Sequence, residues 1–282
     1  MRILTLAAVL ATCAAAQKPA PKAHFHHLHL NATNPATSID FYTGKFDCER
    51  AKFSGEDAVW AQKSWILFNK VKDGPASDIT SAIWHFGWGA EDMPAEYRKQ
   101  VDSGTKFQTP ITDISDLMGK PAGSFFFGYV DGPDHALIEL NTAAHHHFGH
   151  IHLLSDDPVA AGEWYQRRFG VTPIIQRQAR VYRGFHVAPM ASFVMDNVNF
   201  VIFPAEYARD AMPDLWKDRK TFDPSKGHVV DHLAFSVDSL RESAAALRND
   251  GVKITEDNGK SILLEGPDKI RIEPVEGQAH KE

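Results

Sequence analysis

Histidines alternate with apolar residues at two matched places in the chain. Residues 27–30 read His-Leu-His-Leu, and residues 150–153 read His-Ile-His-Leu. Successive side chains of a strand point to opposite faces, so each stretch predicts a strand with one histidine face and one apolar face. The apolar face can pack under a helix, and the histidine face then looks into the space that the sheet encloses.

Each of these strands is followed by a signal for the start of a helix. Asn34 and Asp157 lie seven residues after the first histidine of their stretch, and each precedes a proline. An Asn or Asp side chain caps the first free N–H groups, and proline fits the first helical turn. We therefore expect a short helix after each strand, ended by Gly44 in the first half and by Gly170 in the second.

A second pair of segments predicts two further modules of the same kind. Residues 84–88 match residues 231–235, with a histidine second in each, and helix-forming residues follow, most clearly at 240–249. Both modules end in a Gly-Pro-Asp turn and an alternating strand. The fold class is therefore α+β, with four βαβββ modules paired in chain order into two cup-shaped mixed-sheet domains.

These patterns divide the chain into six parts. They are a signal peptide at 1–16, a linker at 17–22, a first domain at 23–143, a linker at 144–148, a second domain at 149–276 and a tail at 277–282.

The first sixteen residues indicate export. Arg2 precedes an apolar run that is too short to span a bilayer, and three alanines at 14–16 suit a signal peptidase. We expect a periplasmic or extracellular protein. A lipid anchor on Cys13 is the alternative at this end of the chain.

A long polar segment at 204–227 has no counterpart in the first half. Segments of this length without periodicity often form a lid or a binding loop. Tyr207 and Trp216 could cover a ligand there, and a plain surface excursion is the alternative.

Two histidines and one glutamate recur in each half. Two imidazoles and a carboxylate can occupy three positions of a divalent metal ion and leave others open for water, oxygen or substrate. Such ligands suit Zn, Mn, Fe or Ni, and we expect one or two ions per chain. The expected sets are His27, His85 and Glu139 in the first half, and His150, His232 and Glu273 in the second.

His29 and His152 lie two residues along the strand from an expected ligand. Each is a candidate general base because its side chain shares the face of that ligand. The alternative for both is a histidine that only lines the pocket.

These residues give the chain a resemblance to the vicinal oxygen chelate superfamily, which includes glyoxalases, extradiol dioxygenases, fosfomycin-resistance proteins and bleomycin-binding proteins. The histidine strands, the segments around His85 and His232, and the hairpins that end at Glu139 and Glu273 carry it. The resemblance implies metal inside each cup and a substrate that chelates it through neighbouring oxygens. Extradiol members usually keep a tyrosine ten residues before the glutamate, as Tyr129 is here.

The resulting functional hypothesis is a metal-dependent isomerase, lyase or ring-cleaving dioxygenase with a small-molecule substrate. The alternative is an exported protein that binds or sequesters a small molecule without turnover. A net charge of −6 gives no basic surface for nucleic acid, and no lysine- or arginine-rich run favours a membrane surface. The oligomeric state stays open, because two halves in one chain allow a monomer without requiring one.

Overall fold

The computed structural model describes residues 22–77 and 79–281. The expected signal peptide and Cys13 lie outside the described residues. Among the helices of the described part, none is long and apolar enough to cross a membrane.

Four βαβββ modules follow one another along the described chain. The first contains β1 (His24–Ala32), α1 (Pro35–Lys45), β2 (Glu49–Phe53), β3 (Glu56–Trp60) and β4 (Trp65–Lys70). The second contains β5 (Ile83–Ala90), α2 (Met93–Asp102), β6 (Phe107–Asp113), β7 (Phe126–Asp131) and β8 (Leu137–Thr142). The third contains β9 (Phe148–Ser155), α3 (Pro158–Phe169), β10 (Ile174–Gln176), β13 (Met190–Met195) and β14 (Val198–Pro204). The fourth contains β15 (Val230–Val237), α6 (Leu240–Asn249), β16 (Ile254–Asp257), β17 (Ile262–Glu265) and β18 (Arg271–Glu276).

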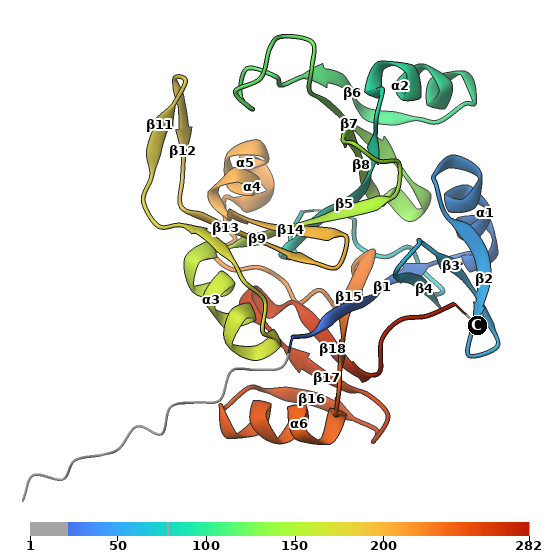
Figure 1. Cartoon of the computed structure of the whole chain (residues 1–282), viewed down its shortest axis with the longest axis vertical. Helices are drawn as coiled ribbons and strands as arrows, with labels where there is room; N and C mark the ends of the chain where they lie inside the picture. The colour runs from blue at the N-terminus through green and yellow to red at the C-terminus, as the bar shows by residue number, and fades with distance from the viewer. Residues whose placement is uncertain (1–21, 78, 282) are drawn as a thin grey trace, which may run out of the picture.

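The modules form two eight-stranded mixed sheets, which confirms the predicted fold class (Figure 1). The first sheet has the order β16-β17-β18-β15-β1-β4-β3-β2, and the second has the order β10-β13-β14-β9-β5-β8-β7-β6. At the centre of each sheet two modules meet through their opening strands, β1 against β15 and β5 against β9, both antiparallel.

The expected pairing of modules in chain order is wrong. The first sheet joins the first module to the fourth, and the second sheet joins the second module to the third. Residues 23–143 and 149–276 are therefore the two halves of the sequence repeat, and each sheet contains strands from both halves. All four modules offer the same kind of opening strand for pairing, so the repeat alone cannot say which two meet.

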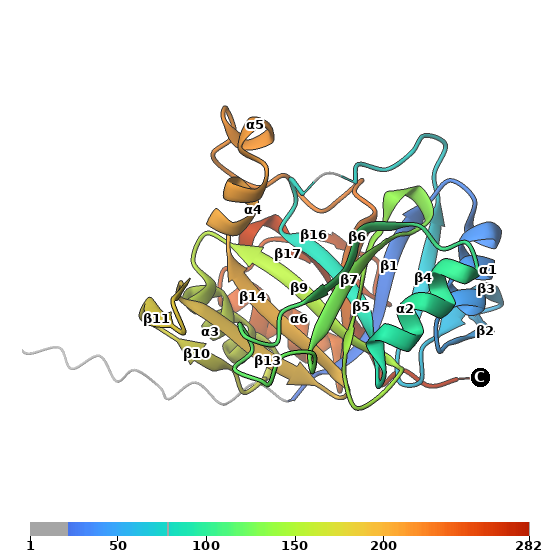
Figure 2. The same cartoon turned by 90° about the horizontal axis from the view of Figure 1, so that it is seen from above.

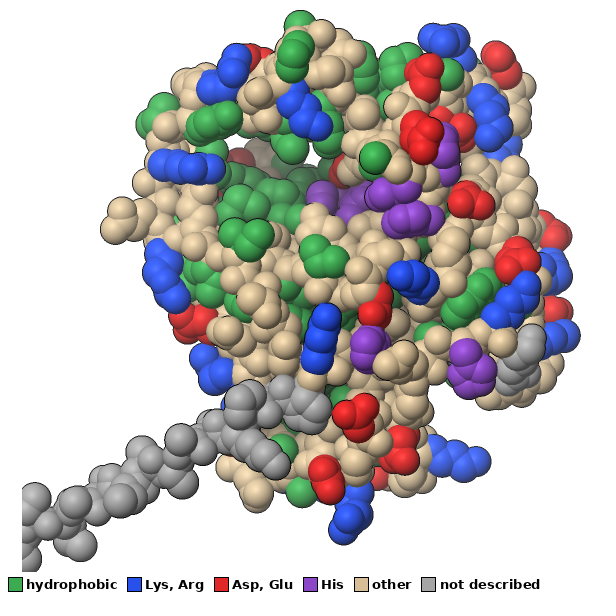
Figure 3. Space-filling view, in the orientation of Figure 1, with side chains coloured by type: hydrophobic (Ala, Val, Ile, Leu, Met, Phe, Trp, Pro, Cys, Tyr) green, Lys and Arg blue, Asp and Glu red, His purple; other side chains and the backbone are tan. Residues whose placement is uncertain are grey.

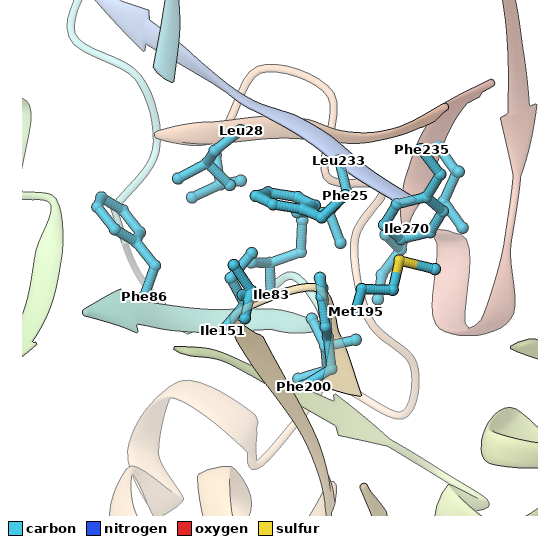
Figure 4. Packing of buried hydrophobic residues seen from close by; sticks show 14 of the residues in the cluster. Phe25, Leu28, Ile83, Phe86, Ile151, Met195, Phe200, Leu233, Phe235 and Ile270 are labelled. Carbon is cyan, nitrogen blue, oxygen red and sulfur yellow. The ribbon is translucent and has the colours of Figure 1, made fainter. Parts of the chain in front are cut away.

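One hydrophobic core lies between the two sheets (Figure 4). Phe25 and Leu28 of β1 face Phe86, Ile151 and other apolar side chains of the second sheet. The Phe25 ring centroid lies 6.1 Å from that of Phe148 on β9. Burying each such side chain contributes about 1.5–3 kcal/mol, so this shared core holds the sheets back to back. The histidine faces are consequently on the opposite side of each sheet.

The predicted helix starts are confirmed. Asn34 Oδ1 accepts a hydrogen bond from the Thr37 backbone N–H at 3.3 Å, and Asp157 Oδ1 accepts one from Ala160 at 3.0 Å. The two other modules repeat the arrangement with Asp92 before α2 and Ser239 before α6. In all four modules the cap thus lies seven residues after the histidine of the opening strand.

The two glycines expected to end helices behave differently. Gly170 ends α3 in the left-handed conformation with φ 63°, as predicted. Gly44 lies inside α1, which continues to Lys45, so that prediction is wrong. The cap residue of α1 is Phe46, whose extended backbone (φ −128°) requires no glycine.

The third module carries two insertions. The hairpin of β11 (Arg180–Tyr182) and β12 (Phe185–Val187) interrupts it, and α4 (Glu206–Ala211) and α5 (Pro213–Trp216) follow β14. Figure 2 shows α4 and α5 projecting from the body of the molecule. Trp216 is buried against Phe222, with ring centroids 5.2 Å apart, so its side chain stabilises the insertion.

Candidate metal centres

The first histidine cluster lies across β1, β15 and β18. His29 pairs with His232 across the two central strands. Two residues along, His27 pairs with Ala234, which pairs in turn with Glu273 on β18. One ligand atom from each of the four polar side chains lies within 4.8 Å of the others. We call His27, His29, His232 and Glu273 the β1/β15 cluster.

The second cluster repeats this layout on the other sheet. His85 pairs with His152, and His150 pairs with Gly87, which pairs with Glu139 on β8. Ring nitrogens of the three histidines lie within 4.8 Å of one another. Glu139 Oε2 is 2.8 Å from His85 Nε2, and Glu139 Oε1 is 3.8 Å from His150 Nε2. We call His85, His150, His152 and Glu139 the β5/β9 cluster.

The structure brings the six expected ligands together in different combinations from those predicted. His85 and Glu139 are joined by His150 and not by His27. His232 and Glu273 are joined by His27 and not by His150. The reason is the pairing of the sheets, which places the opening strands of non-consecutive modules side by side.

Five of the six histidines in the two clusters are held neutral, and His232 is the exception. Burial lowers the pKa of His85 and His29 to about 3 and that of His150 to about 4. It also lowers the pKa of His27 and His152 below the ordinary value. A neutral imidazole is the form that binds a metal ion, so these side chains need no deprotonation to act as ligands.

The buried ring nitrogens around each glutamate could hold a metal ion. His27 Nε2 lies 3.2 Å from Glu273 Oε2 and His85 Nε2 lies 2.8 Å from Glu139 Oε2, while His150 Nε2 is buried without a hydrogen-bond partner. A buried polar atom without a partner costs about 1–3 kcal/mol. A divalent ion beside the glutamate would satisfy these nitrogens with the ligand types that such ions accept.

Glu273 supplies an ionised carboxylate to the β1/β15 cluster. Its Oε2 lies 3.2 Å from His27 Nε2 and 3.1 Å from His232 Nε2. Burial raises the pKa of this carboxyl, but the contacts with His232 and His27 outweigh burial and hold the pKa below its usual range. Negative charge at this point is what a cation requires.

Asp231, which the sequence patterns missed, supports His232 from behind. Asp231 Oδ1 lies 2.8 Å from His232 Nδ1, and the carboxylate is itself held by Arg271 and by the Gly227 backbone N–H. Burial lowers the pKa of His232, but the contacts with Asp231 and Glu273 outweigh it and raise the pKa. The available signal was an Asp next to a ligand histidine, but strict strand alternation predicts that its side chain points to the opposite face.

Tyr129 lies beside the glutamate of the β5/β9 cluster. It pairs with Glu139 across β7 and β8, and their side chains are hydrogen bonded. Burial and the neighbouring carboxylate raise the pKa of Tyr129 well above the ordinary value. The phenol therefore keeps its proton and can donate it.

Aromatic side chains surround the β5/β9 cluster. The His152 ring centroid is 5.2 Å from that of Phe203 and 6.4 Å from that of Trp84. Trp84 lies 6.4 Å from Tyr129, and Phe203 lies 5.7 Å from Tyr207 of α4. Tyr207 also lines a cavity of about 410 Å³ between α4 and the β11–β12 hairpin.

This side of the molecule is hollowed. Figure 3 shows a hollow with hydrophobic side chains inside and histidine side chains at one edge. The β11–β12 hairpin contacts the segment after β6, where Arg183 pairs with Asp116 at 2.5 Å. Tyr182 Oη fills the space beside Gly119, at 2.2 Å from where a Cβ would lie. The hairpin thus bridges to the second module on this face.

Apolar side chains and the C-terminal tail border the β1/β15 cluster. The Phe53 ring centroid lies 6.3 Å from that of His27 and 5.4 Å from that of Trp65. Ala279 of the tail packs against this group. Lys281 pairs with Glu49 at 2.6 Å, and Figures 1 and 2 both place the C-terminus beside β2.

Comparison with solved structures identifies the fold. Glyoxalase I from Zea mays is 13% identical and superposes with a TM-score of 0.64, covering 90% of this chain and 92% of that chain. The chain has the fold of glyoxalase I. A putative dioxygenase from Bacillus subtilis is also 13% identical, with a TM-score of 0.57 over 91% of this chain and 86% of that chain.

The fold is thus shared with a glyoxalase I and a putative dioxygenase, as the motifs of the sequence predicted. No family model and no curated protein matches the sequence itself. At these identities the likeness establishes the fold, and the chemistry has to be argued from the two clusters.

Proposed function

We propose that the protein is a divalent-metal-dependent enzyme that acts on a small substrate through two neighbouring oxygens. The observation that supports this most is that, in both clusters, the Nε2 atoms of two buried histidines lie close to the carboxylate of one glutamate. Imidazole nitrogens and a carboxylate at this spacing form a donor set that suits a divalent cation.

Three residues in each cluster would hold an ion. They are His27, His232 and Glu273 in the β1/β15 cluster, and His85, His150 and Glu139 in the β5/β9 cluster. A bound divalent ion would supply Lewis acidity and a template for two substrate oxygens. Ligand type leaves Zn, Mn, Fe and Ni as candidates.

The remaining side chains would move protons and exclude water. His29 and His152 are neutral and adjoin the ligands, so each is placed to accept a proton from a substrate carbon or oxygen. Tyr129 keeps its proton and can donate to a developing oxyanion. Trp84 and Phe203 would shield the reacting atoms from water. Isomerisation, elimination and ring cleavage are all compatible with these roles.

Metal content and turnover test the proposal together. Protein purified without a histidine tag is expected to retain one or two equivalents of divalent metal, and Glu139→Gln and Glu273→Gln are each expected to lose a share. The loaded protein is then assayed for oxygen uptake with a catechol and for isomerisation of an α-hydroxycarbonyl compound. Failure to take up any metal on reconstitution overturns the proposal. Full metal without turnover favours the alternative, a protein that binds a small molecule.

We also propose that the chain is exported, on the basis of residues 1–16. Expression in a bacterial host should yield a periplasmic protein whose N-terminus begins close to Gln17. Recovery of the chain from the cytoplasm with Met1 or Arg2 retained would contradict this.

A further inference from the structure

Each central strand carries a bulge directly before its ligand histidine. The pairing of β1 with β15 shifts between Phe25 and His27, and again between His29 and Leu30, while β5 and β9 shift at the corresponding places. A bulge inserts one unpaired residue and redirects its side chain. The four bulged residues are His26 on β1, Asp231 on β15, Trp84 on β5 and Gly149 on β9.

In the β1/β15 cluster both bulged side chains contact a ligand imidazole. Asp231 Oδ1 lies 2.8 Å from His232 Nδ1, and His26 Nδ1 lies 2.8 Å from His27 Nδ1. Both contacts are buried, which leaves Nε2 of each ligand histidine to face Glu273. Asp231 is held in turn by Arg271, so its carboxylate cannot turn away easily.

In the β5/β9 cluster the bulged residues give no such support. Gly149 has no side chain, and Trp84 presents its ring to His85, with centroids 4.7 Å apart. Nδ1 of His85 is buried without a hydrogen-bond partner. The same strand geometry therefore gives the Nδ1 atoms of His27 and His232 a polar partner and gives Nδ1 of His85 none.

Polar partners of this kind change metal affinity. A carboxylate on the far nitrogen of a ligand histidine fixes the tautomer and orientation of the ring and makes it a stronger donor. Removing such a partner typically lowers metal affinity by about 10–100-fold. The two clusters, which have matching ligands, should therefore bind the same ion with different strength.

We propose that the β1/β15 cluster is the tighter metal site, with Asp231 and His26 as its positioning residues, and that the β5/β9 cluster is the site that meets substrate. The second cluster adjoins Trp84 and Phe203, and Phe203 contacts Tyr207, which lines the cavity beside the β11–β12 hairpin. This assignment rests on the proposed function, because it presupposes that both clusters bind metal.

A titration of metal-free protein with Co(II), in competition with a chromophoric chelator, tests the order of binding without any assay of activity. Two steps are expected, separated by at least about 10-fold in dissociation constant. Glu273→Gln should remove the tighter step, and Glu139→Gln should remove the weaker one. Asp231→Asn and His26→Ala should each weaken the tighter step by about 10–100-fold and leave the weaker step unchanged.

Asp196→Asn is the matched control. Asp196 Oδ1 lies 2.7 Å from His24 Nδ1 on the same strand β1, outside the cluster, so its loss should change neither step. Two equal steps, removal of the tighter step by Glu139→Gln, or an unchanged titration in both Asp231→Asn and His26→Ala would overturn this inference while leaving the proposed function intact. No cobalt binding at all would overturn both.

Discussion

At position 87, beside the second cluster, the structure leaves no room for a Cβ. A Cβ on Gly87 would lie 2.5 Å from the His150 ring and 2.1 Å from the Glu139 carbonyl oxygen. The equivalent position of the first sheet is Ala234, which has a Cβ and tolerates it. The His150 ring therefore lies directly over the strand, in the space that glycine leaves.

Gly87→Ala is expected to displace His150 and to lower metal affinity at the β5/β9 cluster by more than about 10-fold, since even the loss of a ligand's hydrogen-bond partner costs that much. Ala234→Gly is the reciprocal control and should leave both sites able to bind. Metal content after dialysis, measured by mass spectrometry, checks the prediction. Full occupancy of both sites in Gly87→Ala would show that the ring moves aside without cost.

The buried histidines make the metal-free protein sensitive to acid. The pKa of His85 is about 3 in the folded chain and near 6.5 ordinarily, so between these values only the unfolded chain binds the proton. The free energy of unfolding should therefore fall as the pH drops below 6.5, by about 1.4 kcal/mol per pH unit for this residue. In His85→Gln the slope between pH 6 and pH 4.5, measured by urea unfolding, should be smaller by about that amount. Equal slopes would mean that His85 is protonated in the folded state.

Among the elements, those with strictly local causes could be predicted. The alternation of histidine with leucine gave the faces of β1 correctly, and Asn34 and Asp157 gave two helix starts. The bulges could not be predicted, because they depend on how two strands pair across the sheet. In a regular strand, His26 and Asp231 would point to the face opposite the ligand histidines. The bulge at each of these residues brings its side chain beside the ligands.

The helix caps offer a direct test at this scale. Asp157→Ala removes the acceptor for the Ala160 N–H and should lower the free energy of unfolding by about 1 kcal/mol. Asp157→Asn keeps an acceptor oxygen and should lie within a few tenths of a kcal/mol of the wild type. Urea unfolding of the metal-free proteins compares them. Equal stability of the Ala variant would show that solvent satisfies the first turn of α3.

At the scale of the whole molecule, the sequence predicts the modules and not their partners. All six expected ligands lie in the two clusters, yet the sets of three were wrong because the first module pairs with the fourth. Pairing is decided by the core between the sheets, where Phe25 of the first module meets Phe148 and Phe200 of the third. Contacts between residues more than a hundred positions apart leave no local pattern.

Double variants distinguish the two ways of pairing. His85→Ala with His150→Ala removes two ligands from one cluster, so the chain should keep the ion of the other, although the two residues come from different halves. His85→Ala with His232→Ala removes one ligand from each cluster and should lose both ions. If the modules paired in chain order, each double variant would lack one ligand at both sites, and neither variant would keep an ion. Mass spectrometry under native conditions counts the ions directly, and one retained equivalent in the first double, against none in the second, is the expected result.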